Sequence, residues 1–489
     1  MPRPNLLFIY TDEQRADTMA AYGNRKIQTP SLDRLAETST VFERAYVTQP
    51  VCTPSRASLL TGLYPHTNGC VRNNVPLSLD VPTIAEMLPV GEYATCHIGK
   101  WHLGDEMFPQ HGFQEWAATE DAYRPFYREG RDRTMPCHYS RFLAENGFQP
   151  APDGFFNRNA AALMPEEFSK PAFEAREASR FIRENRDRPF CLFVNFLEPH
   201  MPFFGPRDGQ YDPGEIDLPA NFDCPPDETT LLRNRLMMWQ FAMTGMDGRP
   251  LKTERDWREL IARYWGMCSH VDTYAGAILR TLEECGVDDN TIVVYTSDHG
   301  DMMGSHRMLT KCVMYEEASR VPLLVRLPGQ TEARRVQGPV SQVDLVPTLL
   351  EAMGVPVPDS LEGTSLAASL RDGSEPGRDA VIEWNGVNNP SKHEKQLRAV
   401  PEEMRDKVTL EDVQAAEADP LRTISTPEGW KLTLSPLLGQ HELYNLNEDP
   451  LETRNLAPDP GKRPLMRDLR ARMVEWQKAT SDKVTLPEV

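Results

Sequence analysis

The sequence contains no run of about 18 consecutive apolar residues, the length that a membrane-spanning helix requires. The apolar run at residues 5–10 is too short for the hydrophobic region of a signal peptide, and it leads into Asp12 instead of a small-residue cleavage site. From these two absences we expect no membrane partner and a cytoplasmic location, or a periplasmic or secreted location if the sequence is a trimmed mature form.

Positive charge is also scarce. The chain has 53 Lys and Arg against 72 Asp and Glu, which gives a net charge of −19 and a pI of about 5.1. A chain this acidic is a poor candidate for non-specific binding to nucleic acid or to anionic membranes. We therefore expect no nucleic-acid partner, and an anionic substrate would require a positive field that is local to its site.

Paired cysteine spacings are missing as well. The nine Cys residues are an odd number, and they follow neither a zinc-finger nor a disulfide spacing. This usage is typical of free thiols in a reducing compartment. Internal repeats and low-complexity tracts are also absent, so the 489 residues are available for two or three ordinary globular domains.

Short apolar runs alternate with helical patterns along most of the chain. Runs rich in β-branched and aromatic residues predict strands that are buried on both faces, at residues 6–10, 93–98, 190–197, 292–295 and 322–327. Helical patterns lie between them, at residues 31–39, 55–62, 173–184, 257–285 and 344–353. This alternation predicts a parallel sheet that is covered by helices on both faces.

The character of the sequence changes past about residue 375. Three short strands and a closing helix are predicted there, at residues 423–425, 430–434, 442–446 and 464–479. We therefore predict a catalytic domain at 1–375 and a smaller α+β subdomain at 376–489. Three polar segments with weak periodicity, 120–170, 200–255 and 385–420, are interpreted as surface insertions that shape a rim.

Reactive polar residues directly follow four of the predicted strands. In chain order they are Asp12 and Glu13, Lys100 and His102, His200, and Asp298 with His299. Ligands of open α/β sheets bind beyond the carboxyl ends of the strands. Four separate stretches of chain are therefore expected to direct acids, imidazoles and an ammonium group to one edge of the sheet.

The strongest local signal is the segment 51–62. Pro54 suits the first position of a helix, so Cys52 is expected just before the helix N-terminus, where free N–H groups favour an anion. Arg56 lies one turn along the same face. A nucleophile, an anion-binding helix end and a guanidinium thus fit within one turn. On position alone, a buried structural cysteine explains Cys52 equally well.

The run Cys52-Thr-Pro-Ser-Arg56, followed by Ala-Ser-Leu-Leu-Thr-Gly62, resembles the signature of the type I, formylglycine-dependent sulfatases. Six further blocks resemble those of the family and stand in the same order: residues 4–12, 99–104, 198–203, 297–301, 311–322 and 442–446. The resemblance implies an alkaline-phosphatase-like fold. This fold is a central, mostly parallel sheet sandwiched by helices, with a smaller C-terminal α+β subdomain that carries a short antiparallel sheet.

The resemblance also implies a metal centre. Asp12, Asp298 and an oxygen on the modified Cys52 would hold a divalent cation, and oxygen ligands of this kind suit Ca²⁺, with Mg²⁺ or Mn²⁺ as alternatives. Glu13 and His299 are expected to complete the ligand set. The competing interpretation of these two residues is a position beside the metal without ligation.

The implied reaction is hydrolysis of a sulfate ester. Formylglycine made from Cys52 by a maturation enzyme would attack sulfur as its hydrate, while the metal, Arg56 and Lys100 stabilise charge on the transferred group. His200 and Lys311 are the expected proton donors to the leaving alcohol and also substrate-binding residues. His102 would help to deprotonate the second hydroxyl, so that sulfate is expelled.

Asn73 and Asn74 follow the signature helix at a distance suited to a hydrogen bond with substrate. Which of the two faces the site is left open, and Asn73 is favoured. The expected partner is a sulfated small molecule or glycan, and nothing in the sequence fixes the oligomeric state.

Two other functions compete with this one. Phosphonate monoester and phosphodiester hydrolases of the same fold look similar, but they tend to have Ala where this chain has Ser55, and they lack a pair like Lys100 and His102. The other alternative, from a different class, is a non-catalytic anion-binding protein in which Cys52 stays a thiol.

Overall fold

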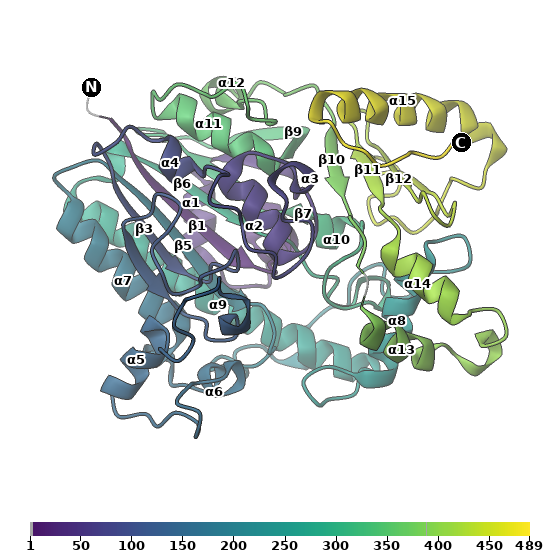
Figure 1. The fold of residues 1–489 in the computed structure, drawn as a ribbon, viewed down its shortest axis with the longest axis horizontal. Helices are drawn as coiled ribbons and strands as arrows, with labels where there is room; N and C mark the ends of the chain where they lie inside the picture. The colour runs from purple at the N-terminus through teal and green to yellow at the C-terminus, as the bar shows by residue number, and fades with distance from the viewer. Residues whose placement is uncertain (1–2, 388) are drawn as a thin grey trace.

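A computed structural model of the chain describes residues 3–387 and 389–489 (Figure 1). Within these residues nine strands form one sheet in the order β4-β3-β5-β1-β6-β8-β2-β7, and β9 pairs with β2. The strands are β1 (Asn5–Asp12), β2 (Thr40–Tyr46), β3 (Ala94–Gly99), β4 (Glu115–Ala118), β5 (Phe190–Pro199), β6 (Thr291–Ser297), β7 (Arg320–Val321), β8 (Leu323–Arg326) and β9 (Arg334–Ser341).

The half of the sheet that matters for the site is parallel. Strands β4, β3, β5, β1 and β6 run in one direction, and β8 is antiparallel to β6. Every residue of β1 is buried, as expected of a strand covered on both faces. The predicted fold class, a mostly parallel sheet sandwiched by helices, is confirmed.

Helices cover this sheet. Two long ones, α7 (Lys170–Asn185) and α9 (Glu254–Cys285), pack against each other and against β5, and α2 (Cys52–Thr61) lies over the sheet at the centre of Figure 1. The remaining helices of this part are α1 (Pro30–Ala36), α3 (Pro65–Asn68), α4 (Ile84–Met87), α5 (His138–Glu145), α6 (Arg158–Ala162), α10 (Glu316–Ser319), α11 (Leu345–Ala352) and α12 (Ala367–Asp372). None of the helices in the described ranges is long and apolar enough to span a membrane.

A second, antiparallel sheet follows near the C-terminus. Its strands are β10 (Ala380–Glu383), β11 (Arg422–Ser425), β12 (Trp430–Leu434) and β13 (Glu442–Asn445), and α15 (Arg463–Thr480) packs on it. The predicted boundary at residue 375 falls between α12 and β10, and as a domain boundary it stays a prediction. Ile382 and Trp384, at the end of β10, pack with Tyr46 and Val51 of the larger part.

Two of the predicted insertions meet in space. Helix α8 (Leu232–Thr244) belongs to the segment 200–255, and α13 (Pro390–Ala399) and α14 (Leu410–Ala418) belong to 385–420. The three helices bury a shared apolar cluster, which includes Leu236, Val400 and Val413 (lower right in Figure 1). Helices thus occupy parts of two segments that the weak periodicity had indicated as surface insertions.

The strands that the sequence analysis did not find lie mainly at one side of the sheet. β2 carries the charged pair Glu43-Arg44, and β9 contains Gly338 and Pro339, which weaken a strand pattern. Both strands form only because they pair with each other, and β2 also pairs with β7 and β8. The nine cysteines, all within the described residues, are free.

Candidate active site

The ends of four neighbouring strands meet at one edge of the sheet. In the register of the sheet, Thr11 pairs with Ser297, Asp12 with Pro199, and Gly99 with Asn195. The polar residues that follow these strands are therefore brought together, as they would be in any parallel sheet with this strand order.

The signature segment forms α2 and begins at Cys52 itself. This differs from the expectation that the helix starts at Pro54. Val51 is extended and ends the incoming loop, and the N–H of Thr53, in the first turn, is satisfied by Oδ1 of Asn73 at 3.0 Å. All ten residues of α2 are buried, so Cys52 is held at the N-terminal end of a helix enclosed by protein.

Four side chains converge at this point as a candidate metal cluster. The ligand atoms of Asp12, Cys52, Asp298 and His299 all lie within 4.8 Å of one another and all four residues are buried. Nε2 of His299 is 3.3 Å from the Cys52 sulfur, 3.6 Å from Oδ1 of Asp12 and 3.5 Å from Oδ1 of Asp298. Nδ1 of His299 donates to the carbonyl of Gly300 at 2.9 Å, which leaves the lone pair of Nε2 directed into the cluster.

Glu13 lies beside this cluster in an unusual backbone conformation, with φ of 72°. Its Oε2 accepts a hydrogen bond from Nζ of Lys311 at 2.6 Å and lies 3.5 Å from Nε2 of His200. Its Oε1 is buried and has no hydrogen-bond partner among the described residues. Asp12, Glu13 and His200 form a second group that could hold a cation. Glu13 therefore stands next to the first cluster with one oxygen free to ligate.

Two buried cations neutralise the carboxylates. Arg56 donates from Nη2 to Asp12 at 2.7 Å and from Nε to Asp298 at 2.8 Å, and its Nη1 binds the Lys100 carbonyl and Oδ1 of Asn195. Nζ of Lys100 donates to Asp12. Burial alone would raise the pKa of Asp12, but Lys100 and the other nearby cations hold that pKa well below its usual value. Asp12 is therefore ionised.

The unmodified side chain of Cys52 is a poor nucleophile. Burial, reinforced by the Asp12 carboxylate, raises the pKa of the thiol to about 11. Because the thiolate is the reactive form, little of it is present at neutral pH. Cys52 therefore does not resemble the low-pKa cysteines that attack substrate directly.

His102 lies on the other side of the first turn of α2, where its carbonyl accepts from Oγ1 of Thr53. Its Nε2 is 2.8 Å from Oδ1 of Asn74, an atom that can only accept, so the proton of neutral His102 is on Nε2. Nδ1 keeps its lone pair and has no partner in the part of the chain that the structure describes. Burial, with Lys100 and Arg56, holds the pKa of His102 well below its usual value. His102 thus has the tautomer and charge of a base.

His200 and Lys311 both lie beside Glu13. Burial and the nearby Lys311 charge hold the pKa of His200 well below its usual value. Nδ1 of His200 donates to the Met201 carbonyl at 2.7 Å. Burial would lower the pKa of Lys311, but Glu13 together with Cys52 and Asp12 raises it well above its usual value. The pair is therefore a neutral imidazole and an ammonium.

The structure adds residues that sequence reasoning did not select. The ring of Tyr123 stacks on His102, with centroids 3.9 Å apart and planes at 25°, and Nζ of Lys100 lies 5.5 Å from the same ring. Arg158 donates to the Tyr123 hydroxyl at 2.6 Å. Both residues belong to the segment 120–170, which carries no periodic pattern, so no local signal distinguished them. Asn73 caps α2, and Asn74 is the one that contacts His102.

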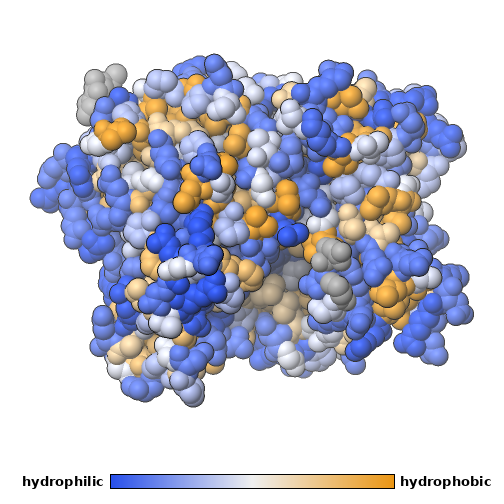
Figure 2. Space-filling view, viewed as in Figure 1, coloured by the Kyte–Doolittle hydropathy of each residue, from blue (hydrophilic) through white to orange (hydrophobic). Residues whose placement is uncertain are grey.

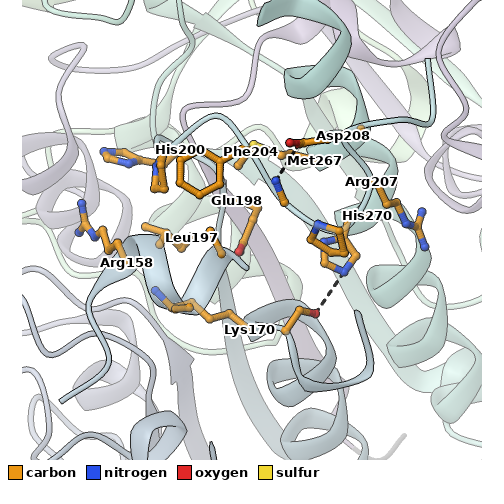
Figure 3. Close-up of a pocket in the computed structure, with 17 residues that line it drawn as sticks. Arg158, Lys170, Leu197, Glu198, His200, Phe204, Arg207, Asp208, Met267 and His270 are labelled. Carbon is orange, nitrogen blue, oxygen red and sulfur yellow. Dashed lines mark hydrogen bonds between the residues drawn. The ribbon is translucent and has the colours of Figure 1, made fainter. Parts of the chain in front are cut away.

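A pocket opens beside His200. Its walls include Arg158, Lys170, Glu198, Arg207 and His270. Figure 3 shows His200 and Arg158 at one side of this pocket and Arg207 at the other. The molecular face seen in Figure 2 is hollowed between the part that contains α5 and α6 and the part that contains α8 and α13.

Comparison with known families decides the interpretation of these residues. The family model described as Sulfatase matches residues 4–355. This chain belongs to the sulfatase family. The resemblance of its sequence blocks to sulfatases is thereby confirmed, and with it the prediction of a sulfuric-ester hydrolase.

Individual relatives of this sulfatase match most of this chain and most of their own length. A protein named uncharacterized sulfatase YidJ from Escherichia coli (strain K12) is 30% identical and matches 94% of this chain and 84% of its own length. An N-acetylglucosamine-6-O-sulfatase of Bacteroides thetaiotaomicron is also 30% identical and matches 76% of this chain and 71% of its own.

Among solved structures, the phosphonate monoester hydrolase SpPMH of Silicibacter pomeroyi superimposes with a TM-score of 0.78 at 23% identity, over 98% of this sulfatase and 96% of that chain. At this identity the likeness establishes the shared fold alone. The two sequence relatives therefore agree with the family assignment, and the structural neighbour agrees with the fold.

Proposed function

We propose that this sulfatase hydrolyses a sulfate monoester of a small molecule or glycan, using formylglycine formed from Cys52 by a maturation enzyme and a bound divalent metal. The observation that supports this most is the convergence of Asp12, Cys52, Asp298 and His299 within 4.8 Å, with Lys100 and Arg56 hydrogen-bonded to the carboxylates. The hydrated aldehyde would supply an oxygen nucleophile and a second hydroxyl through which sulfate can be released.

The residues present fit a divalent cation. Two buried carboxylates and an imidazole with its Nε2 lone pair directed between them form a donor set of the type that holds Ca²⁺, Mg²⁺ or Mn²⁺. The orphaned Oε1 of Glu13 offers a further oxygen. When bound, the metal would offset the repulsion among these carboxylates and polarise the sulfate oxygens. We favour Ca²⁺ because most of the donors are oxygens.

The protein residues divide the proton transfers between two sides. His102 is neutral with a free lone pair on Nδ1, so it is suited to accept a proton from the nucleophile side. Lys311 carries the proton on the opposite side, where it can donate to the leaving oxygen, and the neutral His200 beside it positions that oxygen. Arg56 acts through Asp12 and Asp298, because all three of its nitrogen atoms are used by protein groups. Lys100 remains the ammonium closest to the nucleophile that can contact sulfate.

The alternative is hydrolysis of phosphonate monoesters or phosphodiesters on the same site. One observation supports this candidate: a phosphonate monoester hydrolase shares the fold. Lys100 and His102 favour sulfate, because the phosphonate monoester and phosphodiester hydrolases that the sequence resembles lack such a pair.

One comparison tests the proposal. The enzyme, produced with a formylglycine-generating system, is assayed on 4-nitrophenyl sulfate, 4-nitrophenyl phenylphosphonate and bis(4-nitrophenyl) phosphate, and the Cys52 peptide is examined by mass spectrometry. We expect the largest kcat/KM on the sulfate and an aldehyde at position 52. A larger kcat/KM on either phosphorus ester supports the alternative, and full activity with an unmodified thiol contradicts the mechanism.

A further inference from the structure

Arg158 brings a positive charge to the site from outside the central sheet. It is the first residue of α6, within the predicted insertion 120–170. Its Nη2 donates to the Tyr123 hydroxyl at 2.6 Å, and the Tyr123 ring in turn stacks on His102. One side chain therefore separates the guanidinium from the imidazole that the proposed mechanism uses as a base.

The charge of Arg158 is only partly neutralised. Its Nε donates to Oε2 of Glu120 at 2.6 Å, but Oε1 of the same carboxylate accepts from Lys170. Two cations thus share one carboxylate. Lys170 is buried, whereas 24% of the Arg158 side chain is exposed, so the excess positive charge reaches solvent at Arg158.

Nearby acidic residues do not neutralise this excess positive charge. Glu174 and Glu198 lie close to Lys170, but burial raises the pKa of Glu198 to about 7 and that of Glu174 well above its usual value. Neither carboxyl therefore contributes a full negative charge at neutral pH. In a chain whose net charge is −19, a cation left in excess beside the catalytic groups is an unusual local feature.

The Arg158 side chain is partly open to solvent at the site. Nη1 of Arg158 makes no hydrogen bond with any residue of the described ranges, so both of its N–H groups are available. Arg158 lines the pocket beside His200, and Figure 3 shows the two side chains at the same side of it. His200 lies on the leaving-group side of the proposed mechanism, so Arg158 stands where the alcohol portion of the substrate extends.

We propose that Arg158 is a specificity-determining residue that binds a second anionic group of the substrate, a carboxylate or a sulfate, adjacent to the sulfate ester that is cleaved. This inference rests on the proposed function and narrows its substrate class to sulfate esters of acidic alcohols, such as a sugar that also bears a carboxylate or another sulfate. A guanidinium is suited to this task because its planar N–H groups match the oxygens of both anions.

The test compares three aryl sulfates that differ only in the group at position 3 of the ring: a carboxamide, a carboxylate and a sulfate. Steady-state kinetics are measured for the wild-type enzyme and for Arg158→Gln, each with formylglycine. We expect the variant to lose roughly tenfold or more in kcat/KM on one or both charged substrates, mainly through KM, because a charge-assisted hydrogen bond is lost. The carboxamide should change little. The two charged substrates distinguish carboxylate from sulfate recognition.

Two further variants separate recognition from support of the fold. Arg207→Gln removes the same charge from the far side of the same pocket, where Glu166 already binds that guanidinium at 2.9 Å and 2.5 Å, so it should not change the preference among the substrates. Tyr123→Phe keeps the ring stacked on His102 and removes only its link to Arg158. If Arg158 merely holds Tyr123, both Arg158→Gln and Tyr123→Phe will slow all three substrates equally, and the proposal is overturned.

A binding measurement covers the case in which turnover is absent. In Cys52→Ala protein, which cannot cleave the ester, calorimetry measures the affinity for the three aryl sulfates with and without Arg158→Gln. Loss of affinity confined to a charged substrate supports the subsite, and an equal change for all three refutes it. If the wild-type enzyme cleaves none of the three esters, the proposed function fails, and the calorimetric result still decides the role of Arg158.

Discussion

Nε2 of His299 lies 3.3 Å from the sulfur of Cys52, and its other ring nitrogen is held by the carbonyl of Gly300. The ring is therefore fixed before any metal binds, with its lone pair directed at the predicted nucleophile and the two carboxylates. His299 is placed as a metal ligand would be, and we expect its removal to weaken metal binding.

Replacing His299 with Ala should lower metal affinity about 10- to 100-fold, because one ligand and its fixed orientation are lost. Metal content after dialysis against graded chelator, measured by plasma mass spectrometry, checks this. Removing the metal from the wild-type enzyme should also lower its melting temperature, since the buried carboxylates then repel each other. A metal-free wild-type protein with full activity would contradict the metal centre.

Replacing Cys52 with Ala should lower kcat/KM on an aryl sulfate by at least about a thousandfold, because Ala cannot become the aldehyde hydrate. Melting temperature and circular dichroism serve as controls for folding. Cys70→Ala, which changes another buried cysteine outside the site, is the matched variant and should retain turnover.

Replacing Lys311 with Ala should slow poor leaving groups far more than good ones. A general acid contributes roughly 100- to 10,000-fold, and 4-nitrophenolate needs little of that help. The dependence of kcat/KM on the pKa of the leaving alcohol, measured over a series of aryl sulfates, should therefore become steeper. Equal slowing across the series would assign Lys311 to sulfate binding instead.

The two neighbouring asparagines should behave differently. Asn73→Ala removes the acceptor for the Thr53 N–H and should lower the free energy of unfolding by about 1 kcal/mol. Asn74→Gly, which tolerates the φ of 66° at this position, removes the partner of Nε2 of His102, so the imidazole can change tautomer, and it should reduce kcat about tenfold while stability changes little. Urea unfolding and steady-state kinetics on both variants separate the two effects.

His66 links α3 to β10 and to the end of α15. Nδ1 lies 2.5 Å from Oε1 of Glu383, and Nε2 lies 3.0 Å from the Thr480 carbonyl. Burial opposes protonation, but Glu383 together with the Thr480 carbonyl and Asp482 outweighs it and raises the pKa of His66 above 6.5. Because the folded-state pKa is raised, the stabilisation is complete below pH 6.5 and is lost as pH rises through the folded-state pKa.

The melting temperature of the wild-type protein should therefore fall between pH 6 and pH 8.5 by more than that of His66→Gln, which cannot titrate. Differential scanning calorimetry across this range checks the expectation. Parallel curves for the two proteins would show that His66 keeps the same charge throughout.

The sequence predicts the strands and their ends well because buried parallel strands carry a local signal. Asp12, Lys100, His200 and Asp298 each follow an apolar run, and parallel strands bring such ends together whatever lies between them. The order of the strands in the sheet, which decides which ends are neighbours, has no comparable signal in a single sequence.

Residues that the insertions supply to the site could not be predicted in this way. Tyr123 contacts the catalytic imidazole across 21 positions in sequence, and Arg158 contacts Tyr123 across 35, and nothing in their neighbourhood marks them. Likewise, Asn73 and Asn74 are chemically identical, and only the path of the backbone, with φ of 66° at Asn74, directs one to the helix and the other to His102.

The enclosure of α2 also bears on how the protein matures. Cys52 is 2% exposed, and the whole helix that it begins is packed against other elements. An enzyme that oxidises a side chain must bind several flanking residues in its own cleft. The residues of a helix that is enclosed on every face cannot enter such a cleft. Any conversion of Cys52 therefore has to take place on the newly made chain, before the sheet closes around it.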